Sequence, residues 1–136
     1  MVDRRLVDEW LGKADEDFGF ASINLDEDRP FFPQICFHFH QAAEKYLKAY
    51  IVANVLVFRK AHDLVLLLQT CGAHDGSAQE LRDACEYLSA FYVETRYPVH
   101  WPTHFSRDEA RRARECTRQI REWVEARIRP SPTSQS

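Results

Sequence analysis

Hydrophobic positions recur at steps of three and four residues through most of this chain. Such spacing gathers apolar side chains on one stripe of an α-helix. It predicts a first helix over residues 3–24, which the acidic and proline-containing stretch DEDRPFFP then ends. It also predicts a second helix around residues 35–51, whose apolar surface is wide enough for a central position among several neighbours.

Three further helices are expected in the second half. A short third helix begins near His62 and stops by Gly72, and a fourth begins with Ser77 as a capping residue. The fourth helix ends near Thr95, because the prolines that follow disfavour helical geometry.

The fifth helix begins with a capping box, in which Ser106 is followed three residues later by Glu109, and continues to Arg129. The predicted fold is therefore all-α, an up-and-down four-helix bundle with one additional short helix, about five helices in all. A length of 136 residues fits one domain. We expect a bundle over residues 1–129 and a disordered tail at 130–136, which is polar and contains proline.

Composition narrows the class of protein. Hydrophobic residues make up 45% and charged residues 29%, as in a soluble globular protein. The N-terminus lacks the apolar core of a signal peptide, and no apolar run approaches the roughly 18 residues of a spanning helix. We therefore expect no membrane association. The four cysteines include no CxxC pair, so we also expect buried free thiols in a reducing cytoplasm.

The histidines do not predict a metal site, and no cofactor is expected. His38 and His40 would diverge on a helix, and Pro102 separates His100 from His104.

Charge is uneven along the chain, whose formal net charge is −3. Residues 107–136 carry eight arginines against five acids. Five arginines follow steps of four and three along the predicted fifth helix and form what we call the arginine stripe: Arg107, Arg111, Arg114, Arg118 and Arg121. Such a stripe would attract phosphate or an acidic partner. The alternative is a solvated face with local ion pairs, for which the acids of the first helix are obvious counterparts.

The stretch ETRYPVHWPTH at 94–104 concentrates reactive side chains in a predicted loop. Cleavage of RNA without metal needs a base near the 2′-hydroxyl and a cation near the phosphate, and His100 or His104 with Arg96 could supply both. Arg96 could instead form an ion pair with a nearby acid. Tyr97 and Trp101 are either packed aromatics or stacking platforms for bases.

Four segments, in order, resemble the HEPN domain family (higher eukaryotes and prokaryotes nucleotide-binding): WLGKADEDFGFA at 10–21, HQAAEKYLKAYIV at 40–52, AHDL at 61–64 and TRYP at 95–98. The resemblance implies a small helical bundle, commonly a homodimer and often produced beside a minimal nucleotidyltransferase. Some members are metal-independent ribonuclease toxins, in which four to six residues separate an arginine from a histidine and this pair meets the same pair of a second subunit. Here three residues separate Arg96 from His100 and seven separate it from His104, so neither histidine fits.

We therefore expect a cytoplasmic, dimeric module that binds a nucleotide or RNA and acts with a minimal nucleotidyltransferase, as in a toxin–antitoxin pair. The alternatives are a metal-independent endoribonuclease with a nonstandard Arg/His arrangement, and an interaction module without a ligand. The candidate catalytic residues are Arg96, His100 and His104. The candidate ligand-binding residues are Lys45, Lys48, Arg96, Tyr97, Arg111, Arg114 and Arg118. For Lys45 and Lys48 the alternative is a solvated stripe of the second helix, in which Glu44 and Lys48 form an i,i+4 pair.

Overall fold

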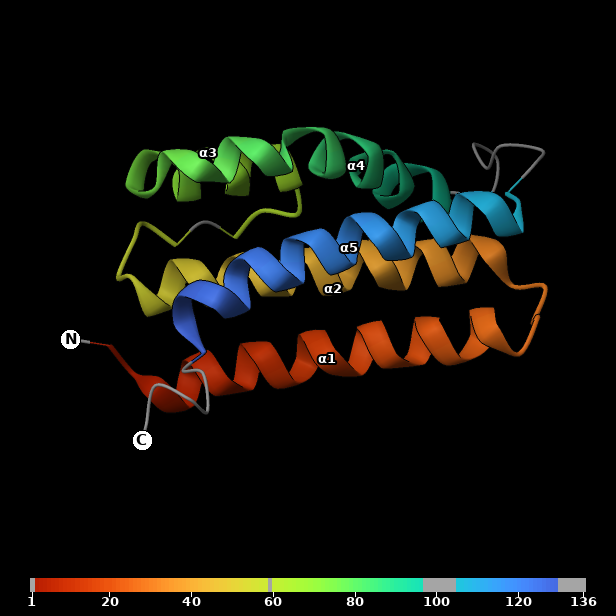
Figure 1. Cartoon of the computed structure of the whole chain (residues 1–136), viewed down its shortest axis with the longest axis horizontal. Coiled ribbons are helices and arrows are strands. Elements are labelled where there is room, and N and C mark those ends of the chain that lie inside the picture. Colours follow the sequence, from red (N-terminus) through yellow and green to blue (C-terminus); the bar gives the residue numbers. More distant parts are fainter. Residues whose placement is uncertain (1, 59, 97–104, 130–136) are drawn as a thin grey trace.

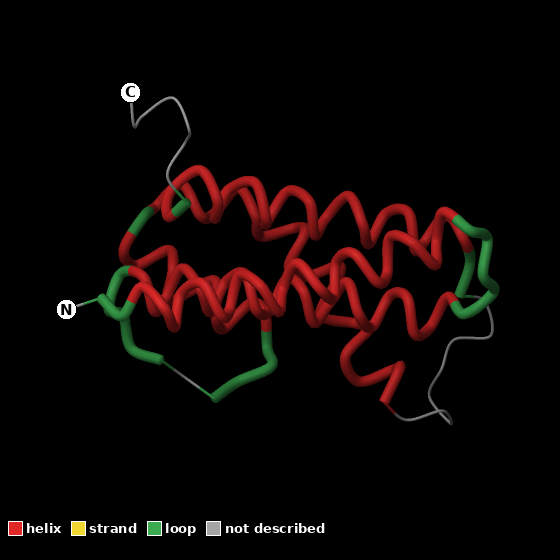
Figure 2. Tube along the Cα trace, turned by 90° about the horizontal axis from the view of Figure 1, so that it is seen from below, coloured by secondary structure: helices red, strands yellow, loops and turns green. Residues whose placement is uncertain are grey.

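The long helices run side by side along the long axis of the molecule (Figure 1; Figure 2). The computed structural model describes residues 2–58, 60–96 and 105–129, and of residues 93–96 it describes the backbone. The elements in order are α1 (Arg4–Asp26), α2 (Phe32–Ala53), α3 (Leu64–His74), the 3-10 helix η1 (Gly76–Leu81), α4 (Arg82–Arg96) and α5 (Arg107–Ile128). Every element in these ranges is a helix, so the predicted all-α helical bundle is confirmed.

Helix α2 is the central element, as its wide apolar surface predicts. It packs against α1, α3, α4 and α5, and its fully buried side chains include Phe39, Tyr46 and Leu47. Helix α1 lies on one side of α2, and α3 and α4 lie on the other, while α5 packs along α2 and contacts both α1 and α4 (Figure 1). The apolar surface of α2 is therefore covered within one protomer.

Local capping sets the helix ends. Asp3 begins α1, because its carboxylate accepts hydrogen bonds from the backbone N–H groups of Arg5 and Leu6. Ser106 caps α5 as predicted, accepting from the N–H of Glu109 at 3.2 Å. The C-terminal ends of α4 and α5 lie within one residue of the predicted ends.

Two helix starts differ from the positions that the sequence predicts. Helix α3 begins at Leu64, because Asp63 is its cap, and His62 therefore lies in the preceding connection. Ser77 is not a cap: the carboxylate of Asp75 accepts from the backbone N–H of Ser77 at 3.0 Å and starts η1. In both cases an aspartate within two positions of the predicted residue accepts from the free N–H groups.

Among the described residues no helix is long and apolar enough to cross a membrane. The four cysteines are free thiols, and three of them are buried as predicted, whereas Cys116 is only half-buried. The predicted tail at 130–136 lies outside the described residues, as do Tyr97, His100, Trp101 and His104.

Candidate functional site

A buried ion pair lies at the centre of the candidate site. Glu44 and Lys48 stand one turn apart on α2, and their side chains are only 4% and 7% exposed. The Lys48 ammonium donates to Glu44 Oε2 at 2.9 Å and lies 5.5 Å from the centre of the Trp10 ring and 5.8 Å from that of Phe58. The i,i+4 pair is present, but the alternative of a solvated stripe does not hold for these two residues, because neighbouring elements cover this face of α2.

His62 contacts the second carboxylate oxygen of Glu44. Its Nδ1 lies 2.9 Å from Glu44 Oε1, although the two residues are 18 positions apart. An ionised carboxylate only accepts hydrogen bonds, so Nδ1 carries the proton and donates. When the ring is neutral, its lone pair is therefore on Nε2. The His62 ring is thus tied to a buried carboxylate at Nδ1, although its side chain is 52% exposed.

Tyr92 of α4 fixes the plane of the His62 ring. The two rings are stacked, with centres 5.0 Å apart and planes inclined by 17°. The same tyrosine contacts the ring of His40, whose centre is 5.3 Å away. His62 is thus restrained at an edge by Glu44 and on a face by Tyr92.

His40 of α2 is the buried member of this group. Its side chain is inaccessible, Nδ1 lies 3.2 Å from Gln41 Oε1, and Nε2 has no hydrogen-bond partner among the described residues. Burial lowers the pKa of His40, and the nearby Glu44 carboxylate only partly opposes that effect. His40 is therefore neutral at pH 7.

An open cleft with a cavity volume of about 370 Å³ lies beside these rings. Its lining residues come from the connection before α3 and from α4: His62, Asp63, Ser89 and Tyr92. The Ser89 hydroxyl donates to the carbonyl of Cys85 at 2.7 Å, so its oxygen can still accept a hydrogen bond from a ligand. The volume suits a small molecule, and we call this region the His62 cleft.

Arg96, the main predicted site residue, is the last residue of α4. It follows Tyr92 by four positions, so its Cα lies about one helical turn further along the face that carries Ser89 and Tyr92. For the alternative of an ion pair at Arg96, the acids considered from the sequence are Glu94, Asp17 and Glu44. Two of them have other partners: Asp17 pairs with Lys45 and His38, and Glu44 pairs with Lys48 and His62.

Lys45 does not join the buried pair of Glu44 and Lys48. Its ammonium donates to Asp17 of α1, and His38 Nδ1 lies 3.1 Å from the other oxygen of that carboxylate. Burial alone would raise the pKa of Asp17, but the hydrogen bonds from His38 and Lys45 bring it below its ordinary value. This cluster ties α1 to α2.

The arginine stripe is fully engaged in ion pairs. Arg107 and Arg114 reach Asp28 and Asp26 at the end of α1, with nitrogen-to-oxygen distances of 3.0 and 2.8 Å. The other three pair within α5: Arg111 with Asp108, Arg118 with Glu115, and Arg121 with Glu125. Arg121 also lies 3.8 Å from Asp15. The structure thus favours the alternative of a solvated face with local ion pairs.

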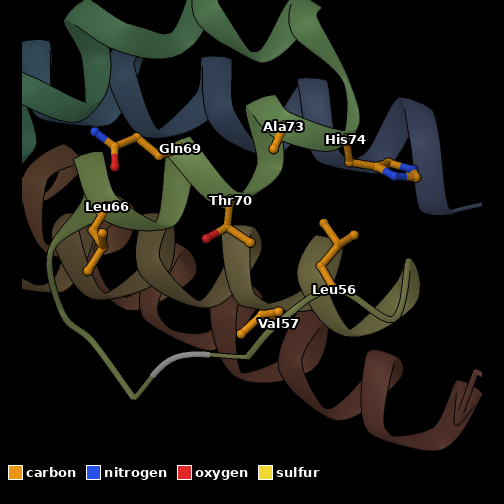
Figure 3. Close-up of a pocket in the computed structure, with 7 residues that line it drawn as sticks. All are labelled: Leu56, Val57, Leu66, Gln69, Thr70, Ala73 and His74. Atoms are coloured by element: carbon orange, nitrogen blue, oxygen red, sulfur yellow. The ribbon is translucent and has the colours of Figure 1, made fainter.

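A second depression, of about 410 Å³, lies between residues 56–57 and α3 (Figure 3). Its lining is largely aliphatic, and Gln69, Thr70 and His74 supply the polar groups. In Figure 3 the His74 ring lies at one end, away from Gln69 and Leu66. No convergence of charged or restrained groups comparable to the His62 cleft is found among its lining residues.

The sequence analysis did not combine Glu44 with His62. Both residues stand in segments that carry the family resemblance, and a histidine followed by an aspartate before an apolar run was a visible signal of a helix cap. Their contact could not be found from spacing, because it depends on how the connection after α2 folds back.

The fold and the site define a small helical-bundle domain with a restrained histidine beside an open cleft. A family model for the HEPN domain matches residues 7–127. Among solved structures, TT1696 from Thermus thermophilus is similar at 27% identity and a TM-score of 0.78, over 88% of this chain and 96% of that one. ST0689, an archaeal HEPN homologue, shares the fold at 21% identity and a TM-score of 0.72, over 90% of this chain and 98% of that one.

No curated protein matches the sequence. Because the family model covers most of the chain, this protein belongs to the HEPN domain family.

Proposed function

We propose that this HEPN domain binds a nucleotide-related ligand in the His62 cleft. The observation that carries the proposal is the restraint of one exposed histidine by a buried carboxylate at 2.9 Å and by a stacked tyrosine. A ring fixed in this way loses little conformational freedom when a ligand binds, so its contacts add to affinity.

The chemistry of the cleft fits a small planar and anionic ligand. The exposed parts of His62 and Tyr92 offer aromatic surface for a base, and Ser89 offers a polar contact. Protonated His62 would add positive charge toward a phosphate, while Glu44 would stabilise that charge from behind. Arg96, at the end of the same face of α4, is the proposed further phosphate contact.

We propose in addition that the domain acts with a minimal nucleotidyltransferase, as in a toxin–antitoxin pair. The family resemblance supports this partner, and a nucleotide-related site would be the natural meeting point with an enzyme that transfers nucleotides. Co-expression with a neighbouring nucleotidyltransferase gene, followed by copurification, tests this part separately.

Equilibrium binding of ATP, AMP and a short RNA to the purified protein tests the ligand. The variant is His62→Asn, which removes the accessible ring, and the matched control is His74→Asn, an exposed histidine of α3. We expect His62→Asn to weaken binding at least about tenfold, equal to about 1.4 kcal/mol, with His74→Asn unchanged. Equal binding by all three proteins, or none by any, would favour an interaction module without a ligand at this cleft.

A metal-independent endoribonuclease is the second candidate, and one observation favours it. A histidine whose Nδ1 donates to a carboxylate is arranged as a general base, and Nε2 of His62 is the nitrogen that Glu44 does not engage. Cleavage that persists in chelator and leaves a 2′,3′-cyclic phosphate would establish this activity. Loss in His62→Asn would assign the base to the cleft, whereas loss only in His100→Ala or His104→Ala would assign it to the 94–104 stretch.

A further inference from the structure

A second cleft lies next to the buried pair of Glu44 and Lys48. Its cavity volume is about 440 Å³, which is within the range of small-molecule sites. Six of the seven lining side chains are apolar, among them Leu6 and Trp10 of α1 and Val55 and Phe58 of the connection after α2. The seventh is Asp3. We call this region the Trp10 cleft.

Two aromatic rings form part of its wall. The rings of Trp10 and Phe58 have their centres 5.9 Å apart and their planes inclined by 39°. Such rings offer a large apolar contact area to a flat ligand. The Lys48 ammonium already lies 5.5 and 5.8 Å from the two ring centres. A cationic group of a ligand would be repelled there, so it needs a partner elsewhere in the cleft.

Asp3 offers that partner. Its Oδ1 accepts hydrogen bonds from the backbone N–H groups of Arg5 and Leu6, at 3.1 and 3.4 Å. Its Oδ2 has no hydrogen bond or ion pair within the described part of the chain. The one charged group of the Trp10 cleft is therefore an acid with an available oxygen, which suits an ammonium donor.

An adjoining hollow strengthens the preference for a cation. It has a volume of about 220 Å³, shares Asp3 and Leu6 with the Trp10 cleft, and adds Arg5 and Glu9. Neither Arg5 nor Glu9 has an ion-pair partner among the described residues. Two carboxylates and one guanidinium thus meet at the mouth of the cleft, and their net charge is negative.

The backbone at Val55 is an independent sign that the Trp10 cleft is used. Val55 lies in the left-handed region with φ 53°, just after the α2 cap, where glycine is common. Its side chain is 62% exposed, so it packs little against the rest of the chain. Non-glycine residues in such conformations cluster at ligand sites. Here the valine supplies an apolar wall that a glycine would lack.

A chain of contacts joins the Trp10 cleft to the His62 cleft. Lys48 lies beside both aromatic rings and donates to Glu44, and the other oxygen of Glu44 contacts His62. Phe58 and His62 also stand four positions apart in the same connection. A ligand that moves the Phe58 ring therefore changes the surroundings of Lys48, and with them the carboxylate that restrains His62.

We propose that the Trp10 cleft is a second ligand site, which takes a small aromatic compound with an ammonium group and is coupled to the His62 cleft through the Glu44–Lys48 pair. The aromatic part packs against Trp10 and Phe58, and the ammonium donates to Asp3. Binding at either cleft then changes the affinity of the other by the same factor. The regulatory meaning of this coupling rests on the proposed function of the His62 cleft, whereas the site itself does not.

Three indole compounds that differ in charge test the site by equilibrium binding: tryptamine, indole and indole-3-propionate. Tryptamine, the cation, should bind at least about tenfold more tightly than the anionic indole-3-propionate. Asp3→Asn removes the charge but keeps a residue that caps a helix equally well. It should weaken tryptamine binding at least about fivefold and leave the affinity for indole unchanged. Glu80→Gln, at an exposed position of η1, is the matched control and should have no effect.

Phe58→Ala tests the aromatic wall, because it should weaken the binding of all three compounds. Failure of tryptamine to bind at about 1 mM, or an affinity for tryptamine that Asp3→Asn leaves unchanged, would overturn the site. Tighter binding of indole-3-propionate than of tryptamine would assign the cleft to anions through Arg5 and would also contradict the proposal.

Nuclear magnetic resonance of the histidine rings tests the coupling. Saturation with tryptamine should shift the ring signals of His62, which His62→Asn identifies, and should leave those of His38 in place. His38 is the matched control, because its Nδ1 also lies at a carboxylate that binds a lysine, Asp17 with Lys45, away from the Trp10 cleft. The measurement needs no ligand in the His62 cleft, so it is independent of whether a nucleotide binds there.

Asp3→Asn separates coupling from direct contact. The shift of His62 should decrease in this variant together with tryptamine binding. A shift that persists at full size in Asp3→Asn would mean that tryptamine binds in the His62 cleft itself, and tryptamine binding without any shift of His62 would mean that the two clefts are independent. Either result rejects the coupled second site.

Discussion

The His62 cleft and the arginine stripe both gather charged and polar residues, but they differ in access to water. Glu44 and Lys48 are almost fully buried beside the cleft, whereas the members of the arginine stripe and their partners are mostly exposed. Exposed ion pairs contribute little, with a typical value of about 0–1 kcal/mol. A buried pair is different, because removal of one partner leaves a charge that water cannot solvate.

The comparison teaches that a regular charge pattern in the sequence does not by itself leave free charges on the folded surface, whereas residues without a visible pattern can form a restrained group. The arginine stripe is conspicuous in the sequence, yet each member has an acid nearby in the folded chain. The group of His62, Glu44 and Tyr92 is inconspicuous in the sequence, yet its members restrain one another.

The largest expected difference between the two regions is in stability. Lys48→Met removes the cation from Glu44 and should lower the free energy of unfolding by about 3 kcal/mol. Arg118→Met, which breaks the exposed pair with Glu115, should lower it by less than about 0.5 kcal/mol. Urea unfolding of both variants checks this, and similar losses would mean that burial does not distinguish the two regions.

A smaller difference should appear in the dependence of stability on pH. The pKa of His40 is lowered in the folded state by burial. Below about pH 6.5 this histidine therefore binds a proton in the unfolded chain more readily than in the folded protein. The contribution of neutral His40 is complete above that pH and is lost as the pH falls, by at most about 1.4 kcal/mol per pH unit.

His40→Leu isolates this effect, because His62, Glu44 and Gln41 remain in place around the substituted side chain. Unfolding measured at pH 7.5, 6.5 and 5.5 should give a flatter profile for His40→Leu than for the wild type. Arg118→Met removes no group that titrates in this range and should give a profile parallel to the wild type. Parallel profiles for all three proteins would contradict the lowered pKa of His40.

The smallest expected effect concerns RNA and the arginine stripe. Since all its members are paired, Arg111→Gln, Arg114→Gln and Arg118→Gln together should change RNA affinity less than about threefold, and the slope of log affinity against log salt by less than about one unit. Titration at several salt concentrations measures both. A fall in slope of about two or more, the amount expected for three lost phosphate contacts on a single strand, would make the stripe a nucleic-acid surface after all.

The sequence by itself determined the helices and the family. Periodicity located α1, α2 and α5, and the Ser106 cap was found from a pattern that spans three residues. These features are local, because a cap or an apolar stripe depends on residues within one or two turns of each other. The four segments that resemble the HEPN family were likewise recognised from the sequence alone.

Only the tertiary structure decided which charges are buried and which groups meet. Glu44 and Lys48 form the same i,i+4 pair on an exposed or a buried helix, so the sequence could not distinguish a solvated stripe from a buried site. Their burial follows from the helices around α2 and from the rings of Trp10 and Phe58, and the contact with His62 follows from the connection that returns to α3. Such contacts join residues far apart in the chain, and their free energy depends on the water that packing removes.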